Sequence, residues 1–187
     1  MPAKKKTPPK IGFLCASLRE GSINARLEAA LIKRFKAAGA KTGRINLAKY
    51  PMPIFHGNLK APASVKKFIS RAKSFDGIVV ISPEYNGCLP PLLKNTIDWS
   101  STVSTDYIKG AVWGLASCSP GPMSGIMCMR QMQFILTRLG GDVLPQQVGC
   151  GNAGAAFNDK GHLIAQPALT FADNMRDMML TRIAQNR

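Results

Sequence analysis

The chain alternates apolar, strand-like runs with helical patterns, and no other feature constrains its fold as strongly. Strands are predicted at 11–17, 42–47, 77–83, 111–118 and 142–149. Helices are predicted at 22–39, 63–75, 91–101, 126–141 and 167–185. Parallel strands need such crossover segments between them, and helices then cover both faces of the sheet. We therefore expect an α/β protein with one parallel sheet.

Glycine and proline residues support several of these boundaries. Gly39 suits the end of the first helix, since glycine readily adopts the left-handed conformation of a helix stop. Pro91 suits the start of the helix at 91–101, where a residue has no intrahelical partner for its N–H. Pro145 cannot donate to a ladder, which favours an edge position for the last strand.

The composition fits one globular domain in a reducing compartment. A chain of 187 residues, 45% of them hydrophobic, is long enough to bury a full core. We expect a disordered basic tail at 1–9 and a single domain at 10–187. No apolar run approaches the roughly 20 residues that span a bilayer, and the beginning of the chain lacks a secretory pattern. The five cysteines form no C-x-x-C pair, so we expect free thiols, no metal site and a cytoplasmic location.

The strong positive charge indicates anionic partners. The formal net charge is +15 at pH 7, which attracts nucleic acids and anionic small molecules alike. The basic residues are spread along the chain, however, without a zinc-finger, RNP or basic-zipper motif. We therefore interpret the charge as an aid to solubility and to the attraction of anionic substrates. Nucleic-acid binding is the less favoured alternative.

Polar loops follow three of the predicted strands. They run from Ala16 to Asn24, from Pro83 to Pro90 and from Ser117 to Gly125, and they are rich in Ser, Gly, Asn and Pro. Ligands of open parallel sheets bind outside the carboxyl ends of the strands, where such loops meet. These loops are therefore the candidate binding site.

The first of these loops has the groups that bind an anion. Ser17, Ser22 and Asn24 offer neutral donors, Arg19 adds a charge, and Gly21 permits a sharp turn before the helix. Free N–H groups at a helix N-terminus favour a phosphate. A triphosphatase P-loop and a dinucleotide G-x-G-x-x-G are both missing here. The alternative is an ordinary helix cap beside a surface arginine.

The second loop suits a flat heteroaromatic ring. It offers the aromatic face of Tyr85, the carboxylate of Glu84, the amide of Asn86 and the bare backbone of Gly87. Since Asn-Gly is also a common turn dipeptide, an ordinary strand-to-helix turn is the alternative.

Two stretches together resemble a known family. "SLREGSIN", followed some sixty residues later by "SPEYNGCLPPLLKNTIDW", is similar to the NADPH-dependent FMN reductase family, which includes bacterial quinone, azo-dye and chromate reductases. The resemblance implies a flavodoxin-like three-layer sandwich with five parallel strands in the order 2-1-3-4-5. It also implies non-covalently bound FMN, NADPH or NADH as the electron donor, and a homodimer or homotetramer.

The resemblance assigns site residues at matching positions. The FMN phosphate would be held by Ser17, Arg19, Ser22 and Asn24 with the backbone of Ile23. The isoalloxazine would be bordered by Pro83, Glu84, Tyr85, Asn86 and Gly87, with Ser117 also near it. No side chain is assigned as a catalytic acid or base.

The chain departs from the family pattern at several positions. Ala16 stands where the family usually has glycine, which would narrow the phosphate turn. Met127 stands where the family usually has the arginine of a Gly-Gly-Ala-Arg loop, and Arg130 is a candidate substitute. Cys88 replaces a residue that is often serine or another small or aromatic residue. Each departure bears on cofactor binding.

The implied activity is a ping-pong transfer of two electrons from NAD(P)H to a small acceptor. A quinone, an azo compound, free flavin or chromate would fit an open, positively charged pocket. We expect the charge to favour NADPH over NADH. The alternative is a flavodoxin-like electron carrier or a flavin-bound sensor without NAD(P)H turnover. Flavodoxins are usually acidic, however, and this chain is basic.

Overall fold

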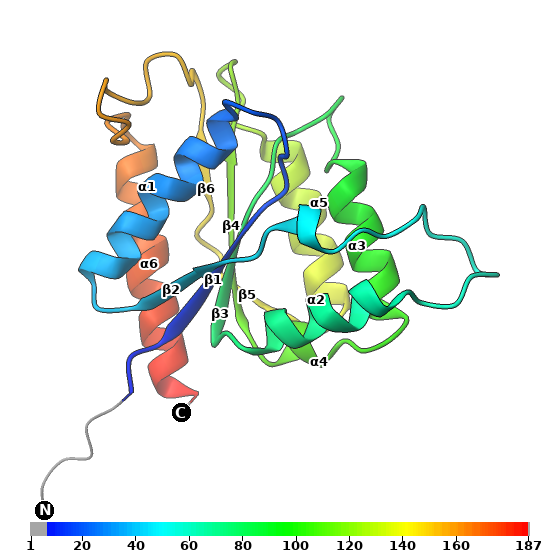
Figure 1. Ribbon diagram of the computed structural model, residues 1–187. Helices are drawn as coiled ribbons and strands as arrows, with labels where there is room; N and C mark the ends of the chain where they lie inside the picture. Colours follow the sequence, from blue (N-terminus) through cyan, green and yellow to red (C-terminus); the bar gives the residue numbers. More distant parts are fainter. Residues whose placement is uncertain (1–6, 187) are drawn as a thin grey trace, which may run out of the picture.

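A six-stranded parallel sheet forms the centre of the computed structural model, which describes residues 7–186 (Figure 1). Its strands are β1 (Lys10–Cys15), β2 (Lys41–Arg44), β3 (Gly77–Ile81), β4 (Val112–Cys118), β5 (Asp142–Val143) and β6 (Val148–Cys150). The strand order is β2-β1-β3-β4-β5, and β6 also pairs with β4. Every pairing is parallel, which confirms the predicted sheet and its order.

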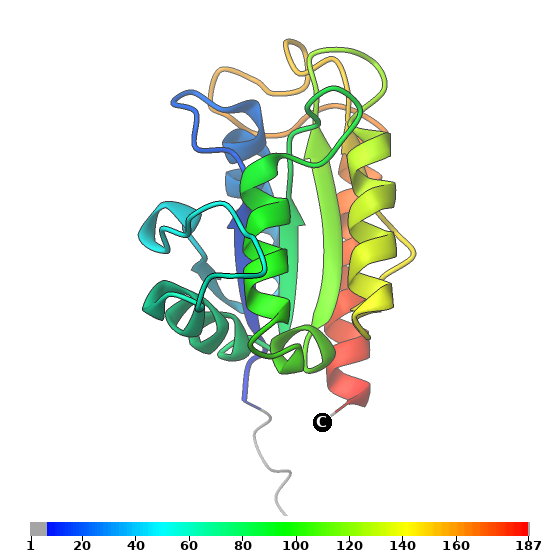
Figure 2. The same cartoon turned by 90° about the vertical axis from the view of Figure 1, so that its right-hand side faces the viewer.

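Helices cover both faces of this sheet, as predicted. They are α1 (Ile23–Ala37), α2 (Ala63–Lys73), α3 (Pro91–Ser101), α4 (Asp106–Lys109), α5 (Ile126–Arg138) and α6 (Ala168–Gln185). Helices α1 and α6 lie on one face, and α2, α3, α4 and α5 lie on the other (Figures 1 and 2). A 3-10 turn at Leu47–Lys49 follows β2. Among the described residues, no helix combines the length and the apolar character needed to cross a membrane.

The central strand β3 shows why the sheet needs two helical layers. All of its residues are buried. Since neighbouring side chains of a strand point to opposite faces, this requires a layer of helices on each face. Ile78 and Val80 pack into the core beneath α2–α5, whereas Val79 and Ile81 pack into the core beneath α1 and α6. Phe35 of α1 meets Phe13 of β1 edge-on, with ring centroids 5.4 Å apart. The apolar helix face predicted for 22–39 is therefore a core face.

The last strand differs from its prediction. The run at 142–149 forms two short strands, β5 and β6, which pair with the two ends of β4. Pro145 lies between them, and since it has no N–H it cannot continue the ladder. The chain therefore leaves β4 after Leu144 and returns at Val148.

The short helix α4 and the N-terminal tail are the two remaining points of comparison with the sequence prediction. The four-residue helix α4 was not predicted, because one helical turn is too short to show a periodicity. The tail predicted at 1–9 falls largely on residues 1–6, which lie outside the described residues. The carbonyl of Pro9 already accepts a hydrogen bond from the N–H of Lys41 at 2.8 Å. The single domain at 10–187 stays a prediction.

The carboxyl ends of β1, β3, β4 and β6 point to one end of the sheet. Figure 2 shows the loops that follow these strands gathered at this end, whereas the C-terminal end of α6 lies at the other. The parallel pairing requires this arrangement, since all strands run in one direction. The three loops that the sequence singled out therefore belong to one region of the surface.

Candidate functional site

The first loop ends in an N-terminus of α1 with free donors. Ser22 is the N-cap, and its hydroxyl accepts a long bond of 3.4 Å from the N–H of Ala25. The N–H groups of Ile23 and Asn24 have no hydrogen-bond partner among residues 7–186, and the first turn of α1 contains no acidic residue. Free donors and a positive helix end form a site for an anion.

Charged and polar side chains surround this helix end. Arg19 is exposed and has no ion pair within the described part of the chain, so its guanidinium is available to a ligand. Ser17 is half-buried between β1 and α1. Ala16 lies directly below, where its N–H donates to the carbonyl of Ile81 at 2.8 Å and its methyl group packs into the core beneath α2–α5. The methyl group is thus accommodated by the core.

Asn24 has a structural role that the sequence did not indicate. Its side-chain amide donates to the carbonyl of Cys118 at 3.0 Å and accepts from the N–H of Cys118 at 2.9 Å. The residue is 2% exposed, so both bonds are buried. They join the start of α1 to the end of β4. The backbone N–H of Asn24, rather than its side chain, is therefore the group that remains open to an anion.

The second loop is a tight hairpin. Asn86 and Gly87 have φ angles of 52° and 75°, and Tyr85 and Cys88 exchange backbone hydrogen bonds of 2.9 and 3.0 Å. Two central residues with positive φ define a type I′ turn, for which Asn-Gly is the preferred sequence. Pro83 is buried at the base of the loop, and the Tyr85 side chain is 49% exposed. The loop thus presents an aromatic ring on a fixed turn.

Helix α5 holds this hairpin in place from the side. A carboxylate oxygen of Glu84 accepts from the N–H groups of Met127 and Cys128 at 2.9 and 3.0 Å, so Glu84 caps α5. Gln131, one turn further along α5, accepts from the N–H of Leu89 at 3.0 Å and donates to the carbonyl of Gly87 at 3.2 Å. Sequence analysis missed Gln131, and no local motif indicates it.

Replacing Glu84 tests this link between the loop and the helix. We expect Glu84→Ala to lower the free energy of unfolding by about 1 to 2 kcal/mol, because two helix N–H groups lose a charged acceptor. Urea denaturation of the purified variants measures the change. Glu20→Ala, which removes an exposed carboxylate from the first loop, is the matched control. An equal loss in both variants would contradict the capping role.

The third loop covers Ser117 rather than exposing it. Ser117 is 0% exposed, and a Cβ atom added to Gly125 would lie only 1.9 Å from its hydroxyl oxygen. Gly125 has a φ of 68°, which a glycine adopts at low cost. The hydroxyl of Ser117 is therefore enclosed beneath the loop. The surface above it carries Met123 and Met127, which are 66% and 45% exposed.

Two cysteines near the loops, Cys15 at the end of β1 and Cys128 in the first turn of α5, are neutral at pH 7. Burial raises the pKa of the Cys15 and Cys128 thiols to about 11 in each case. Since the thiolate is the reactive form, neither residue is poised as a nucleophile. Cys88 is the exposed cysteine of the hairpin. Within the described residues, no three His, Cys, Asp or Glu side chains are grouped so that they could hold a metal ion.

The three loops together fit a ligand with an anionic head and a flat apolar body. The head would meet Arg19 and the N–H groups of Ile23 and Asn24, which have no partner among residues 7–186. The body would meet Tyr85 of the second loop and the exposed Met123 and Met127 of the third loop and the start of α5. These features fit FMN, which combines a phosphate monoester with a planar ring.

Solved structures of known flavoproteins have the same fold. The flavoenzyme NAD(P)H:(acceptor) oxidoreductase FerB from Paracoccus denitrificans superposes with a TM-score of 0.76 at 22% identity, over 95% of this chain and 98% of that one. A flavodoxin from the domain Archaea superposes with a TM-score of 0.63 at 11% identity, over 94% and 99% of the two chains. The chain is therefore a flavodoxin-like protein, with the N-terminus of α1 at the carboxyl end of the sheet.

Sequence comparison places the chain within this class. The profile of the NADPH-dependent FMN reductase family matches residues 9–155, and the chain belongs to that family. It is 29% identical over 130 residues to the quinone reductase of Escherichia coli K12, covering 67% of this chain and 68% of that one. It is 30% identical over 105 residues to the NADPH azoreductase of Bacillus sp. OY1-2, covering 55% and 57%.

Family membership confirms the resemblance seen in the sequence. The protein is an NAD(P)H-dependent oxidoreductase with FMN as its cofactor.

Proposed function

We propose that the protein passes electrons from NADPH through FMN to a quinone or a similar small acceptor. The observation that carries the proposal is the α1 N-terminus, with free N–H groups at Ile23 and Asn24, at the same end of the sheet as the Tyr85 hairpin. The names of its relatives, which include quinone reductases and an azoreductase, support this acceptor class.

The phosphate of FMN would be held by the first loop. The backbone N–H groups of Ile23 and Asn24 would donate to it, and the hydroxyls of Ser17 and Ser22 would add neutral hydrogen bonds. The guanidinium of Arg19 would supply the charge, since it has no carboxylate partner among residues 7–186. A guanidinium pairs with a phosphate by charge-assisted hydrogen bonds.

The ring of FMN would lie against the hairpin and the third loop. Tyr85, Asn86 and Gly87 would border it, with Glu84 and Pro83 fixing the hairpin from below. Ser117 would support the ring indirectly through Gly125, which covers it. Bound FMN supplies the two-electron chemistry, and the protein supplies orientation and an open stacking face. No side chain of the three loops needs to move a proton in this scheme.

Anaerobic reduction tests the proposal directly. We expect the FMN-loaded protein to lose its yellow absorption when NADPH is added and to regain it with benzoquinone. Parallel double-reciprocal plots would be the kinetic sign of a ping-pong order. If protein saturated with FMN stayed oxidised with both NADPH and NADH, the carrier or sensor alternative would replace this proposal.

Charge reversal in the first loop tests the phosphate site. We expect Arg19→Glu to weaken FMN binding about 30-fold, which corresponds to about 2 kcal/mol for a charge-assisted contact. Binding of riboflavin, which lacks the phosphate, should stay unchanged. Fluorescence titration measures both ligands, and Lys66→Glu on α2 is the matched charge control. Equal weakening for riboflavin would show that Arg19 acts on the fold rather than on the phosphate.

A homodimer or homotetramer and a cytoplasmic location complete the proposal. Ile54, which is 86% exposed, borders a cavity of about 390 Å³ that Phe55 and Leu92 also line. A second subunit would cover this apolar surface beside the start of α3.

The cysteines are all free, as expected in a reducing compartment. The net charge of +15 supports a preference for NADPH, and we do not expect a nucleic-acid partner.

A further inference from the structure

A cavity of about 700 Å³ lies away from the three loops, between α1, the segment 158–164 and the first half of α6. It shares no lining residue with the proposed FMN site. Its volume is within the usual range of small-molecule sites, roughly 300 to 1,000 Å³. FMN binding as proposed above therefore does not account for its lining.

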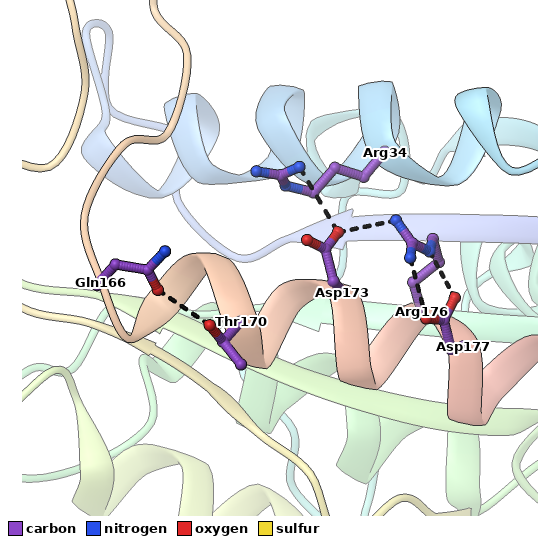
Figure 3. A network of polar contacts seen from close by, with 6 residues as sticks. All are labelled: Arg34, Gln166, Thr170, Asp173, Arg176 and Asp177. Atoms are coloured by element: carbon purple, nitrogen blue, oxygen red, sulfur yellow. Dashed lines mark hydrogen bonds and ion pairs between the residues drawn. The ribbon is translucent and has the colours of Figure 1, made fainter.

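The rim of the cavity carries an excess of positive charge. Lys33, Arg34, Lys160 and Arg176 all line it. The acidic side chains beside them are engaged with the arginines, as Figure 3 shows. Asp173 lies 2.8 Å from a guanidinium nitrogen of Arg176 and 3.6 Å from one of Arg34, and Asp177 also pairs with Arg176. Both lysines therefore add charge that these carboxylates do not balance.

Two of the cations have incomplete or unusual partners. The Nε atom of Arg34 is buried and has no hydrogen-bond partner among the described residues. Lys33 lies with its Nζ atom 2.9 Å from the Nε2 atom of His162, within hydrogen-bond distance of the ring. A lysine held at the rim by an imidazole ring, beside an arginine with an unsatisfied donor, favours an anionic ligand.

The walls of the cavity are apolar and unobstructed. Ala29, Ala30 and Ala37 line it from α1, and Leu169 and Ile164 line it from the other side. Because alanine side chains are small, the apolar part of a ligand can pack directly against this face of α1. A purely inorganic anion would leave these walls in contact with water.

We propose that this cavity binds a small organic anion, with an apolar body on the alanines of α1 and its charged head group among Lys33, Arg34 and Lys160. The site is independent of the FMN site and of the proposed electron transfer. It would let the protein bind an organic acid while the flavin site is occupied.

Binding of a fluorescent organic anion tests the proposal. The probe is 1-anilinonaphthalene-8-sulfonate, titrated into full-length protein that is saturated with FMN so that the phosphate site is filled. We expect one binding event, displacement by octanoate, and no displacement by the same concentration of inorganic phosphate. The absence of binding, or equal displacement by phosphate, would overturn the proposal.

Three variants locate the probe. The double variant Lys33→Glu/Lys160→Glu reverses the charge of both rim lysines, and Ala30→Phe fills the apolar wall. We expect each to weaken binding about tenfold or more. The control is Lys66→Glu/Lys67→Glu, which makes the same charge change in a shallow basic groove on α2. If the control weakened binding equally, or if both cavity variants bound like the unmodified protein, the site would lie elsewhere. Far-ultraviolet circular dichroism confirms that each variant is folded.

Discussion

Gly125→Ala is expected to lower the free energy of unfolding by about 2 to 4 kcal/mol. The added methyl group would lie 1.9 Å from the hydroxyl oxygen of Ser117 and 2.7 Å from its Cβ atom. The φ of 68° is also unfavourable for alanine, so relaxation of Ser117 alone would not remove the strain. The third loop would have to move away from β4. Chemical denaturation at pH 7 measures the loss.

A second glycine in the same loop serves as the control. A Cβ atom added to Gly121 meets nothing within 4 Å, and its backbone is outside the left-handed region. We expect Gly121→Ala to change the free energy of unfolding by less than about 1 kcal/mol. Since Gly125 positions the loop near the proposed ring site, Gly125→Ala should also weaken FMN and riboflavin equally. Unchanged stability in Gly125→Ala would show that Ser117 is not enclosed in this way.

Asn24→Leu is expected to lower the free energy of unfolding by about 3 kcal/mol. The substitution removes both buried hydrogen bonds to Cys118 and leaves the N–H and the carbonyl of that residue without their side-chain partner. Leucine has the same branched shape as asparagine and leaves no cavity, so the loss reports on the missing hydrogen bonds. The start of α1 would also be released from β4, which should weaken FMN binding.

The matched control for this variant is an exposed asparagine. Asn174 lies on the surface of α6, and Asn174→Leu should change stability by less than about 0.5 kcal/mol. The two variants have identical chemistry and differ in burial. If Asn24→Leu weakened FMN binding while stability stayed unchanged, the side chain of Asn24 would be a phosphate ligand, as the family resemblance implied, and its clamp on β4 would carry little free energy.

Much of the fold could be predicted from the sequence, because it depends on local patterns. The fully apolar β3 and the single apolar face of α1 each follow from side-chain periodicity. The type I′ turn at Asn86 and Gly87 follows from the two residues themselves. The split of the last strand could have been anticipated at Pro145, which has no N–H to donate to the ladder. The prediction of one continuous strand at 142–149 overlooked this interruption.

The interior of the site could not be predicted in the same way. The bonds from Asn24 to Cys118 and from Gln131 to the hairpin join residues that are far apart in the sequence. No local pattern indicates them, because they depend on how α1 and α5 pack against the sheet. The same holds for Ser117, which reads as an available hydroxyl and is covered by Gly125 only once the loop is folded.

The short outer strands have a consequence for how copies of this chain associate. At one side of the sheet, β2 has four residues, two of them the cations Lys41 and Arg44, and at the other side β5 and β6 are interrupted at Pro145. A continuous row of unpaired backbone groups is what recruits a strand from another molecule, and neither border offers one. Aggregation by strand addition is therefore discouraged at both borders, and assembly is left to side-chain surfaces, where a few substitutions can tune its strength.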